Sequence, residues 1–139
     1  LGTDGCASNN DLDLFGEMGM AARCHKVFSG NPEVGSAREV LHMATLNGAR
    51  ALGWDSEIGS LEVGKQADIV AMDLRRPHLT PVYDPISHLV YAASGRDVTH
   101  VWVAGLQVVV HGEVVTVDVG AVMAEVRKMA GAISAGMST

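Results

Sequence analysis

The spacing of apolar residues changes near Trp54, and this change constrains the fold more than any other feature of the sequence. Before it, apolar side chains recur every three or four residues over 11–28 and 37–52, as on the buried face of a helix. After it, short valine-rich and isoleucine-rich runs alternate with turn residues, which is typical of strands. The pattern predicts an α/β chain in which helices come first and a small β-rich unit follows.

Local end signals define the predicted helices. Ser36, with Glu39 three residues later, has the pattern of a capping box, and Gly53 stands in the C-cap position of the helix over 37–52. Asp118 is placed to cap a last helix. The apolar stripe of that helix consists of Val119, Val122, Met123, Val126, Met129 and Ile133.

The β-rich part contains one buried strand and a hairpin. Residues 67–72 form an apolar run of strand length, and residues 98–103 and 106–110 flank the turn pair Ala104-Gly105. A further strand is expected from Gly112 through Val117. These segments predict an antiparallel β unit.

One internal region and the C-terminal tail are predicted to be irregular. Prolines at 77, 81 and 85 punctuate an irregular crossing, and a short helix is expected over 86–93. The tail after Gly136 is expected to be frayed.

Composition excludes several classes of protein. The chain has 139 residues, 47% hydrophobic and 19% charged, which suits one packed domain and is too apolar for a disordered one. A net charge of −6 argues against nucleic acid as a partner. We find no signal peptide and no run long enough to span a bilayer, and neither Cys6 nor Cys24 belongs to a C-x-x-C pair. These features predict a cytoplasmic protein that has no membrane partner.

Asp4 is the strongest candidate for chemistry. It follows a segment that resembles the end of a strand, and small or polar residues separate it from the first helix. Carboxylates at the carboxyl end of a barrel strand are where α/β-barrel enzymes carry their chemistry. An Asp-Gly pair is also a common turn, so the residues alone leave both interpretations open.

Two other patterns do not predict a site. Residues 59–65 match the phosphate-loop spacing G-x-x-x-x-G-K, but Gln66 replaces the required Ser or Thr and a strand follows instead of a helix. A tight turn explains them. The six histidines form no H-x-H or H-E-x-x-H pair, so we interpret them as structural.

Several long motifs, in order, resemble the amidohydrolase superfamily. DGCASNN at 4–10 is similar to its last barrel strand and following loop, and MATLNGARALG at 43–53 with IGSLEVGKQADI at 58–69 is similar to the junction between the barrel and the small β-domain. PHLTPVYDP at 77–85 and HLVY at 88–91 resemble the branch of 5-methylthioadenosine/S-adenosylhomocysteine deaminases and chlorotriazine hydrolases. The resemblance runs from the first residue to about residue 118.

The resemblance implies the fold. The chain would be the C-terminal segment of a metal-dependent (β/α)8 amidohydrolase barrel, followed by strands of the small β-sandwich domain and a terminal helix. Residues 1–53 would hold the last barrel strand and its helices, 54–118 the β-rich segment with a short return helix, and 119–139 the C-terminal helix and tail.

The resemblance also implies an activity, which is hydrolytic deamination of an adenosine-type purine with one divalent metal ion, usually zinc. Asp4 matches the aspartate that ligates this metal and moves a proton from the attacking water to the leaving ammonia. It is therefore the candidate catalytic and metal-binding residue, with a small purine or related heterocycle as partner, and the full-length enzyme is expected to be a homo-oligomer.

The family's histidine ligands have no counterpart in this sequence. We expect them to precede Leu1 in a longer protein, and since catalytic zinc needs three or more protein ligands, we expect the chain to be inactive by itself. We also expect poor monomeric stability or association, because one barrel strand with its helices exposes an edge and an apolar face. A triazine or guanine-type aminohydrolase, or a β-rich interaction domain without catalysis, remains the alternative.

Overall fold

Residues 1–136 are described by the computed structural model of the chain. The tail after Gly136, for which fraying is predicted, lies outside these residues. The α-helices are α1 (Leu14–Ser29), α2 (Ala37–Ala44), α3 (Leu46–Leu52), α4 (Pro85–Tyr91) and α5 (Val119–Gly136). The strands are β1 (Ile69–Met72), β2 (Val98–Val103), β3 (Leu106–Val110) and β4 (Glu113–Val114), and two short 3₁₀ turns are η1 (Pro77–Leu79) and η2 (Gly95–Asp97).

The predicted helix ends are confirmed where capping residues define them. Ser36 and Glu39 form the capping box, with the Ser36 N–H donating to Glu39 Oε2 at 2.8 Å and the Glu39 N–H to Ser36 Oγ at 3.3 Å. Gly53 ends α3 with φ 71°. Asp118 Oδ1 accepts from the Ala121 N–H at 2.9 Å at the start of α5. Each cap satisfies backbone groups that the helix itself leaves unpaired.

The prediction of one helix over 37–52 is wrong, because the chain breaks at Thr45. This residue has φ −123° and ψ −101°, outside the helical region, and separates α2 from α3. Its hydroxyl donates to the Leu41 carbonyl at 2.7 Å. Thr side chains that bond to the preceding turn bend helices.

A strand end is predicted before Asp4, and the structure of this chain assigns no strand to residues 1–5. A strand is defined by hydrogen bonds to a neighbouring strand, and no part of the described chain pairs with this segment. The Leu1 α-amino group donates instead to the Met43 carbonyl at 3.1 Å.

The β unit is a four-stranded antiparallel sheet in the order β1-β2-β3-β4. Ala104-Gly105, with φ 49° and 81°, forms the predicted tight turn between β2 and β3. The strand predicted through Val117 ends at Val114, because pairing with β3 extends only over Glu113 and Val114. The strand predicted over 67–72 begins only at Ile69.

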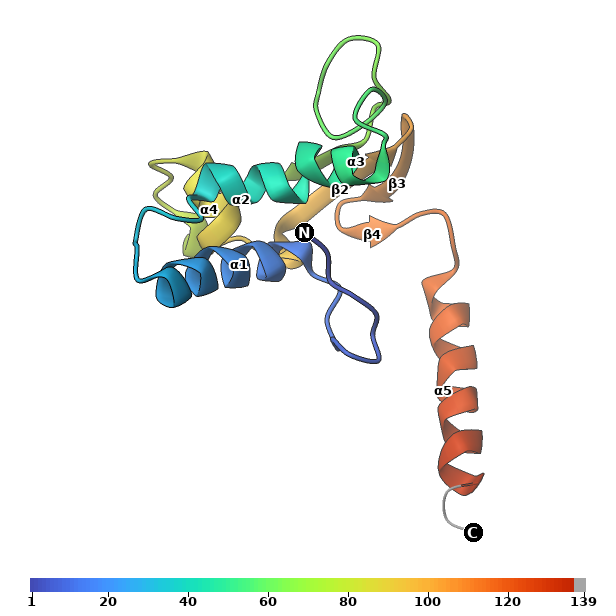
Figure 1. Ribbon diagram of the computed structural model, residues 1–139. Coiled ribbons are helices and arrows are strands. Elements are labelled where there is room, and N and C mark those ends of the chain that lie inside the picture. The colour runs from blue at the N-terminus through green and yellow to red at the C-terminus, as the bar shows by residue number, and fades with distance from the viewer. Residues whose placement is uncertain (137–139) are drawn as a thin grey trace.

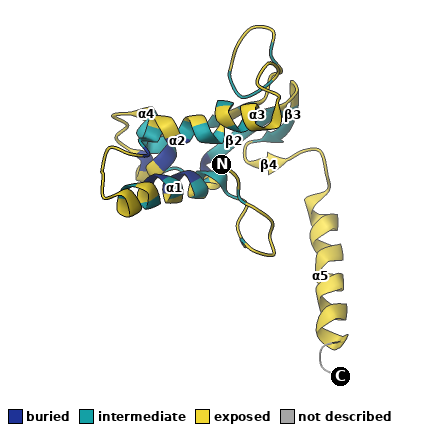
Figure 2. Cartoon of the chain, in the orientation of Figure 1, coloured by how far each residue is buried: buried dark blue, intermediate teal, exposed yellow. Residues whose placement is uncertain are grey.

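The core is small and lies among α1, α2 and α4 (Figures 1 and 2). Its buried cluster consists of Met18, Ala22, Val40 and Val90. Helix α5 projects away from the rest of the chain, and none of its residues is buried. Within residues 1–136, no helix combines the length and apolar character needed to cross a membrane.

Candidate functional site

Asp4 lies on an exposed loop that precedes α1, and its carboxylate is held by two hydrogen bonds. Oδ1 accepts from the Gly5 N–H at 2.8 Å, and Oδ2 accepts from the Ser8 hydroxyl at 2.7 Å. The backbone of Asp4 is left-handed, with φ 59°, a conformation that Asp tolerates better than most residues. The loop closes on itself, because the N–H groups of Ser8 and Asn9 both donate to the Gly5 carbonyl.

These bonds determine the charge of Asp4. The Ser8 hydroxyl, and after it the Gly5 N–H, lower the pKa of the Asp4 carboxyl below its ordinary value of 3.8. The side chain is therefore ionised at neutral pH. A carboxylate has about four lone-pair directions, so each oxygen keeps capacity for a further donor or a cation. An ionised, oriented and solvent-accessible carboxylate suits a metal ligand or a proton acceptor.

Asn9 fastens this loop to α1, and sequence reasoning did not single it out. Its side-chain amide donates to the Thr3 carbonyl at 3.0 Å and to Glu17 Oε1 at 2.7 Å. The first bond holds the chain just before Asp4, and the second reaches the first turn of the helix. Asn9 thus connects the backbone on both sides of Asp4 to a rigid element. The sequence signal for this role is an amide residue, Asn9, between Asp4 and a first helical turn that contains the acidic Glu17.

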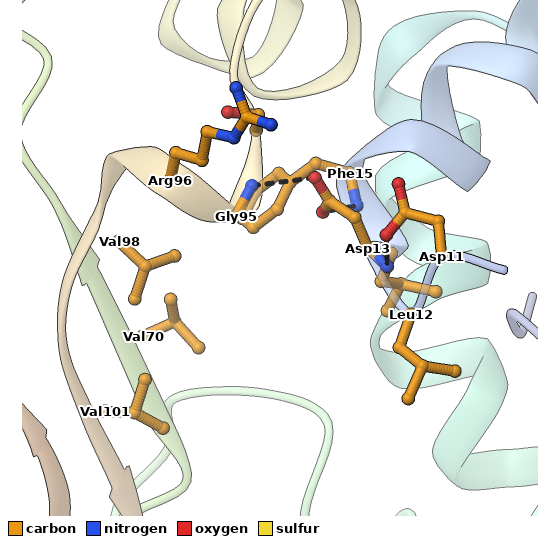
Figure 3. Close-up of a pocket in the computed structure, with 11 residues that line it drawn as sticks. Asp11, Leu12, Asp13, Phe15, Val70, Gly95, Arg96, Val98 and Val101 are labelled. Carbon is orange, nitrogen blue, oxygen red and sulfur yellow. Dashed lines mark hydrogen bonds between the residues drawn. The ribbon is translucent and has the colours of Figure 1, made fainter. Parts of the chain in front are cut away.

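Asp13 anchors the start of α1 to a distant part of the chain. Oδ1 accepts from the Phe15 N–H at 3.0 Å as the N-cap, while Oδ2 accepts from the Gly95 N–H at 2.8 Å. Figure 3 shows this second bond at one side of a hollow of about 700 Å³. Asp11, Asp13 and Phe15 form one wall, and the opposite wall is formed by the valines Val70, Val98 and Val101.

A second carboxylate that the sequence did not single out is buried. Asp97 is 2% exposed, and its Oδ1 lies 2.9 Å from His78 Nε2. Oδ2 accepts from the N–H and the hydroxyl of Ser94 at 3.0 and 3.2 Å. Burial raises the pKa of the Asp97 carboxyl, but the hydrogen bonds from His78 and Ser94 outweigh it and hold the pKa below 3.8. The pair joins η1 to η2.

The segment 59–65 is the turn that the sequence predicts and not a phosphate loop. The Lys65 ammonium donates to the Asp55 carbonyl at 2.6 Å and to Ser60 Oγ at 2.7 Å, so it is occupied within its own loop. The next element is the strand β1. The segment 59–65 therefore provides neither a helix N-terminus nor a free lysine that could bind a phosphate.

Asp4 by itself does not fit a catalytic zinc site. Among residues 1–136, no group of three or more His, Cys, Asp or Glu side chains gathers in a way that would hold a metal ion. Catalytic zinc is bound by three or more protein ligands. The described chain therefore offers fewer than the three ligands that such a site needs.

Comparison with known proteins identifies the class. Residues 1–108 match the Amidohydrolase family. A zinc-bound adenosine deaminase from Xanthomonas campestris superposes with a TM-score of 0.91 at 44% identity, covering 94% of this chain and 30% of that one. Atrazine chlorohydrolase TrzN from Arthrobacter aurescens TC1, complexed with zinc, gives a TM-score of 0.77 at 33% identity over 87% of this chain and 27% of that one. The chain belongs to the amidohydrolase family.

Two curated relatives with high sequence identity are both named deaminases. The chain is 53% identical over 130 residues to 5-methylthioadenosine/S-adenosylhomocysteine deaminase of Syntrophobacter fumaroxidans, covering 94% of this chain and 30% of that protein. It is 52% identical over 130 residues to 5'-deoxyadenosine deaminase of Methanosarcina acetivorans, with the same coverage. The chain thus spans about 30% of the length of the curated relatives it matches.

Proposed function

We propose that the chain is part of a hydrolytic deaminase that converts the amino group of an adenosine-type nucleoside to a carbonyl with release of ammonia. The observation that best supports this proposal is the 53% identity to a 5-methylthioadenosine/S-adenosylhomocysteine deaminase across 94% of the chain. Residues 1–53 would contribute the last strand and helices of a (β/α)8 barrel, 54–118 part of a small β-sandwich domain, and 119–139 a C-terminal helix and tail.

Asp4 is the catalytic residue of this proposal. A divalent metal, zinc by analogy with the bound zinc of the Xanthomonas relative, supplies activation of a water molecule when bound, with its other ligands from outside this chain. Asp4 would contribute one carboxylate ligand, accept a proton at a carboxylate oxygen and release it to the departing ammonia. The lowered pKa of Asp4 supports the role of ionised metal ligand, and its hydrogen bonds from Gly5 and Ser8 fix the direction of the carboxylate.

We also propose the compartment and the oligomeric state of the enzyme. The unpaired thiols of Cys6 and Cys24 suit a reducing compartment, so we assign the enzyme to the cytoplasm. We also propose that the full-length enzyme is a homo-oligomer. The exposed apolar stripe of α5 supports this assignment, since large apolar surfaces are usually covered by another part of an assembly.

A chimaera tests the proposal. Residues 1–139 would replace the matching segment of the Syntrophobacter deaminase. Ammonia release would be measured with 5-methylthioadenosine, S-adenosylhomocysteine and 5'-deoxyadenosine, and chloride release with atrazine. We expect turnover of the nucleosides, and a loss of about 10²–10⁴-fold in kcat for Asp4→Asn. Asp11→Asn, in the same loop, is the matched control and should retain activity.

Three outcomes would contradict parts of the proposal. Turnover of atrazine but of none of the nucleosides would favour the triazine alternative. An Asp4→Asn chimaera as active as the parent would remove Asp4 from the catalytic machinery. Ammonia release by the 139-residue chain alone, with zinc and nucleoside added, would contradict its expected inactivity.

A further inference from the structure

His100 and His111 lie together on the β unit, in a different part of the chain from Asp4. Their ring centroids are 4.9 Å apart, with an interplanar angle of 68°. His100 is on β2, and His111 follows the last residue of β3. Trp102 stacks on the His100 ring at 5.7 Å. The deaminase proposal gives no role to these three rings.

The turn after β3 brings the two rings together. Val110 is the cross-strand partner of His100, so a regular strand residue at 111 would place its side chain on the opposite face of the sheet. His111 instead has φ 52° and Gly112 has φ 83°, which makes the left-handed pair of a tight hairpin turn. The His111 ring therefore lies against His100.

Hydrogen bonds determine which His100 nitrogen is available. The single hydroxyl hydrogen of Thr99 is donated to the Ala71 carbonyl at 3.1 Å, so Thr99 Oγ1 can only accept from the His100 Nδ1 beside it, also at 3.1 Å. This arrangement assigns the proton of the neutral ring to Nδ1. Nε2 carries the lone pair, and a backbone-anchored hydroxyl orients the ring, as the outer partners of metal-binding histidines do.

The separation of the rings matches a shared metal ion. A zinc–nitrogen bond of about 2.0–2.1 Å places the metal about 3.2 Å from the centre of each imidazole, so two such ligands at 90–110° have ring centres about 4.5–5.2 Å apart. The observed 4.9 Å falls within this interval. His111 is exposed, so its ring is accessible to a hydrated ion.

We propose that His100 and His111 form a two-histidine site for a divalent transition-metal ion that prefers imidazole, such as nickel or zinc. His100 binds through Nε2, and water completes the coordination. This site is separate from the metal proposed at Asp4 and stands whether or not the deaminase proposal holds. Imidazole is a ligand for these ions, whereas Mg²⁺ prefers oxygen.

Equilibrium dialysis of the 139-residue chain against Ni²⁺ tests the site with variants that conserve the fold. His111→Asn keeps a residue that tolerates the left-handed turn, and His100→Phe keeps a ring to stack on Trp102. We expect each to weaken Ni²⁺ binding by at least about tenfold. His42→Gln, at an exposed position of α2, should change it less than about twofold.

Trp102 provides a second readout. In a Trp54→Phe background it is the remaining tryptophan, and Ni²⁺ bound beside His100 should quench its fluorescence with the same midpoint as the dialysis. Wild-type affinity in His111→Asn, equal loss in His42→Gln, or Mg²⁺ competing as well as Zn²⁺ would overturn the proposal. If circular dichroism shows that His100→Phe is unfolded, His111→Asn decides alone.

Discussion

At the scale of single residues, hydrogen bonds place Asp4 more than burial does. Asp4 is exposed and has a left-handed backbone, yet its carboxylate has a defined orientation because Gly5 and Ser8 both donate to it. Asn9 connects this ordered loop to α1 through its hydrogen bonds to the Thr3 carbonyl and Glu17. The loop therefore presents a charged group in a fixed direction without a core beneath it.

The role of Asn9 predicts a local effect of its removal. Asn9→Ala loses bonds to the Thr3 carbonyl and Glu17, each worth about 1 kcal/mol, so opening of the Asp4 loop should become several-fold more frequent. Hydrogen–deuterium exchange of the Gly5 and Asn9 amides measures this opening. Asn10→Ala, at the exposed neighbouring position, is the control. Equal exchange in both variants would contradict the anchoring role.

Asp97 predicts a contribution to stability that depends on pH. Its pKa is lower in the folded chain than the ordinary 3.8, so its stabilising contribution is complete above that value and is lost as pH falls through the folded pKa. Asp97→Asn should cost about 2 kcal/mol at pH 7 and flatten the fall in unfolding free energy below pH 4. Urea denaturation at several pH values measures both. Asp55→Asn, in an exposed ion pair with Arg50, is the control and should cost less than about 1 kcal/mol at pH 7.

At the scale of elements, the 53–65 turn region packs closely on α3. A Cβ added at Gly59 would lie 2.8 Å from Ala49 Cβ and 3.0 Å from Leu46 Cα, so the turn and the helix fit together only when residue 59 has no side chain. The same residue has φ 89°. Conformation and packing both require glycine here.

A pair of substitutions separates these two requirements. Gly64→Ala, at φ 96° with no atom within 4 Å, should cost about 1–2 kcal/mol from backbone strain alone. Gly59→Ala should cost about 1–3 kcal/mol more, because the methyl group overpacks the contact with α3. Thermal and urea denaturation of both variants check the difference. Equal destabilisation would show that packing on α3 is loose.

At the scale of the whole molecule, the chain exposes more surface than a compact protein of its mass. Its accessible surface is 9706 Å², whereas a monomer of 14.6 kDa is expected to expose about 6,900 Å². A hollow of about 1030 Å³ beside α1, α2 and α3 is lined mainly by apolar side chains, and the apolar stripe of α5 is solvent-exposed. Exposed apolar area of this extent favours association.

We therefore expect the isolated chain to associate. Sedimentation velocity over a hundredfold concentration range should show species larger than a monomer, and a dye that binds apolar surface should fluoresce. The double variant Val122→Glu with Met129→Glu should reduce association if α5 contributes, while Glu125→Gln on the same helix serves as its control. A monodisperse monomer with a cooperative calorimetric transition would contradict this expectation.

The sequence by itself determined the elements whose signals are local. The capping box of Ser36 and Glu39, the Asp118 cap and the Ala104-Gly105 turn depend on residues within four positions of one another, so composition and spacing suffice to predict them. Asp4 was found through its motif. The break at Thr45 was missed, because a continuous apolar stripe does not reveal a backbone that bends through a side-chain bond.

Only the tertiary structure decided which distant groups meet. Asp13 with Gly95, Asp97 with His78, and His100 with His111 are separated along the chain by loops or by a hairpin, and their spacing carries no period that predicts contact. Two of these contacts satisfy carboxylate oxygens, and the third depends on a left-handed turn. Such pairings follow from the packing of whole elements, because a side chain finds its partner only after the backbone around both has been fixed.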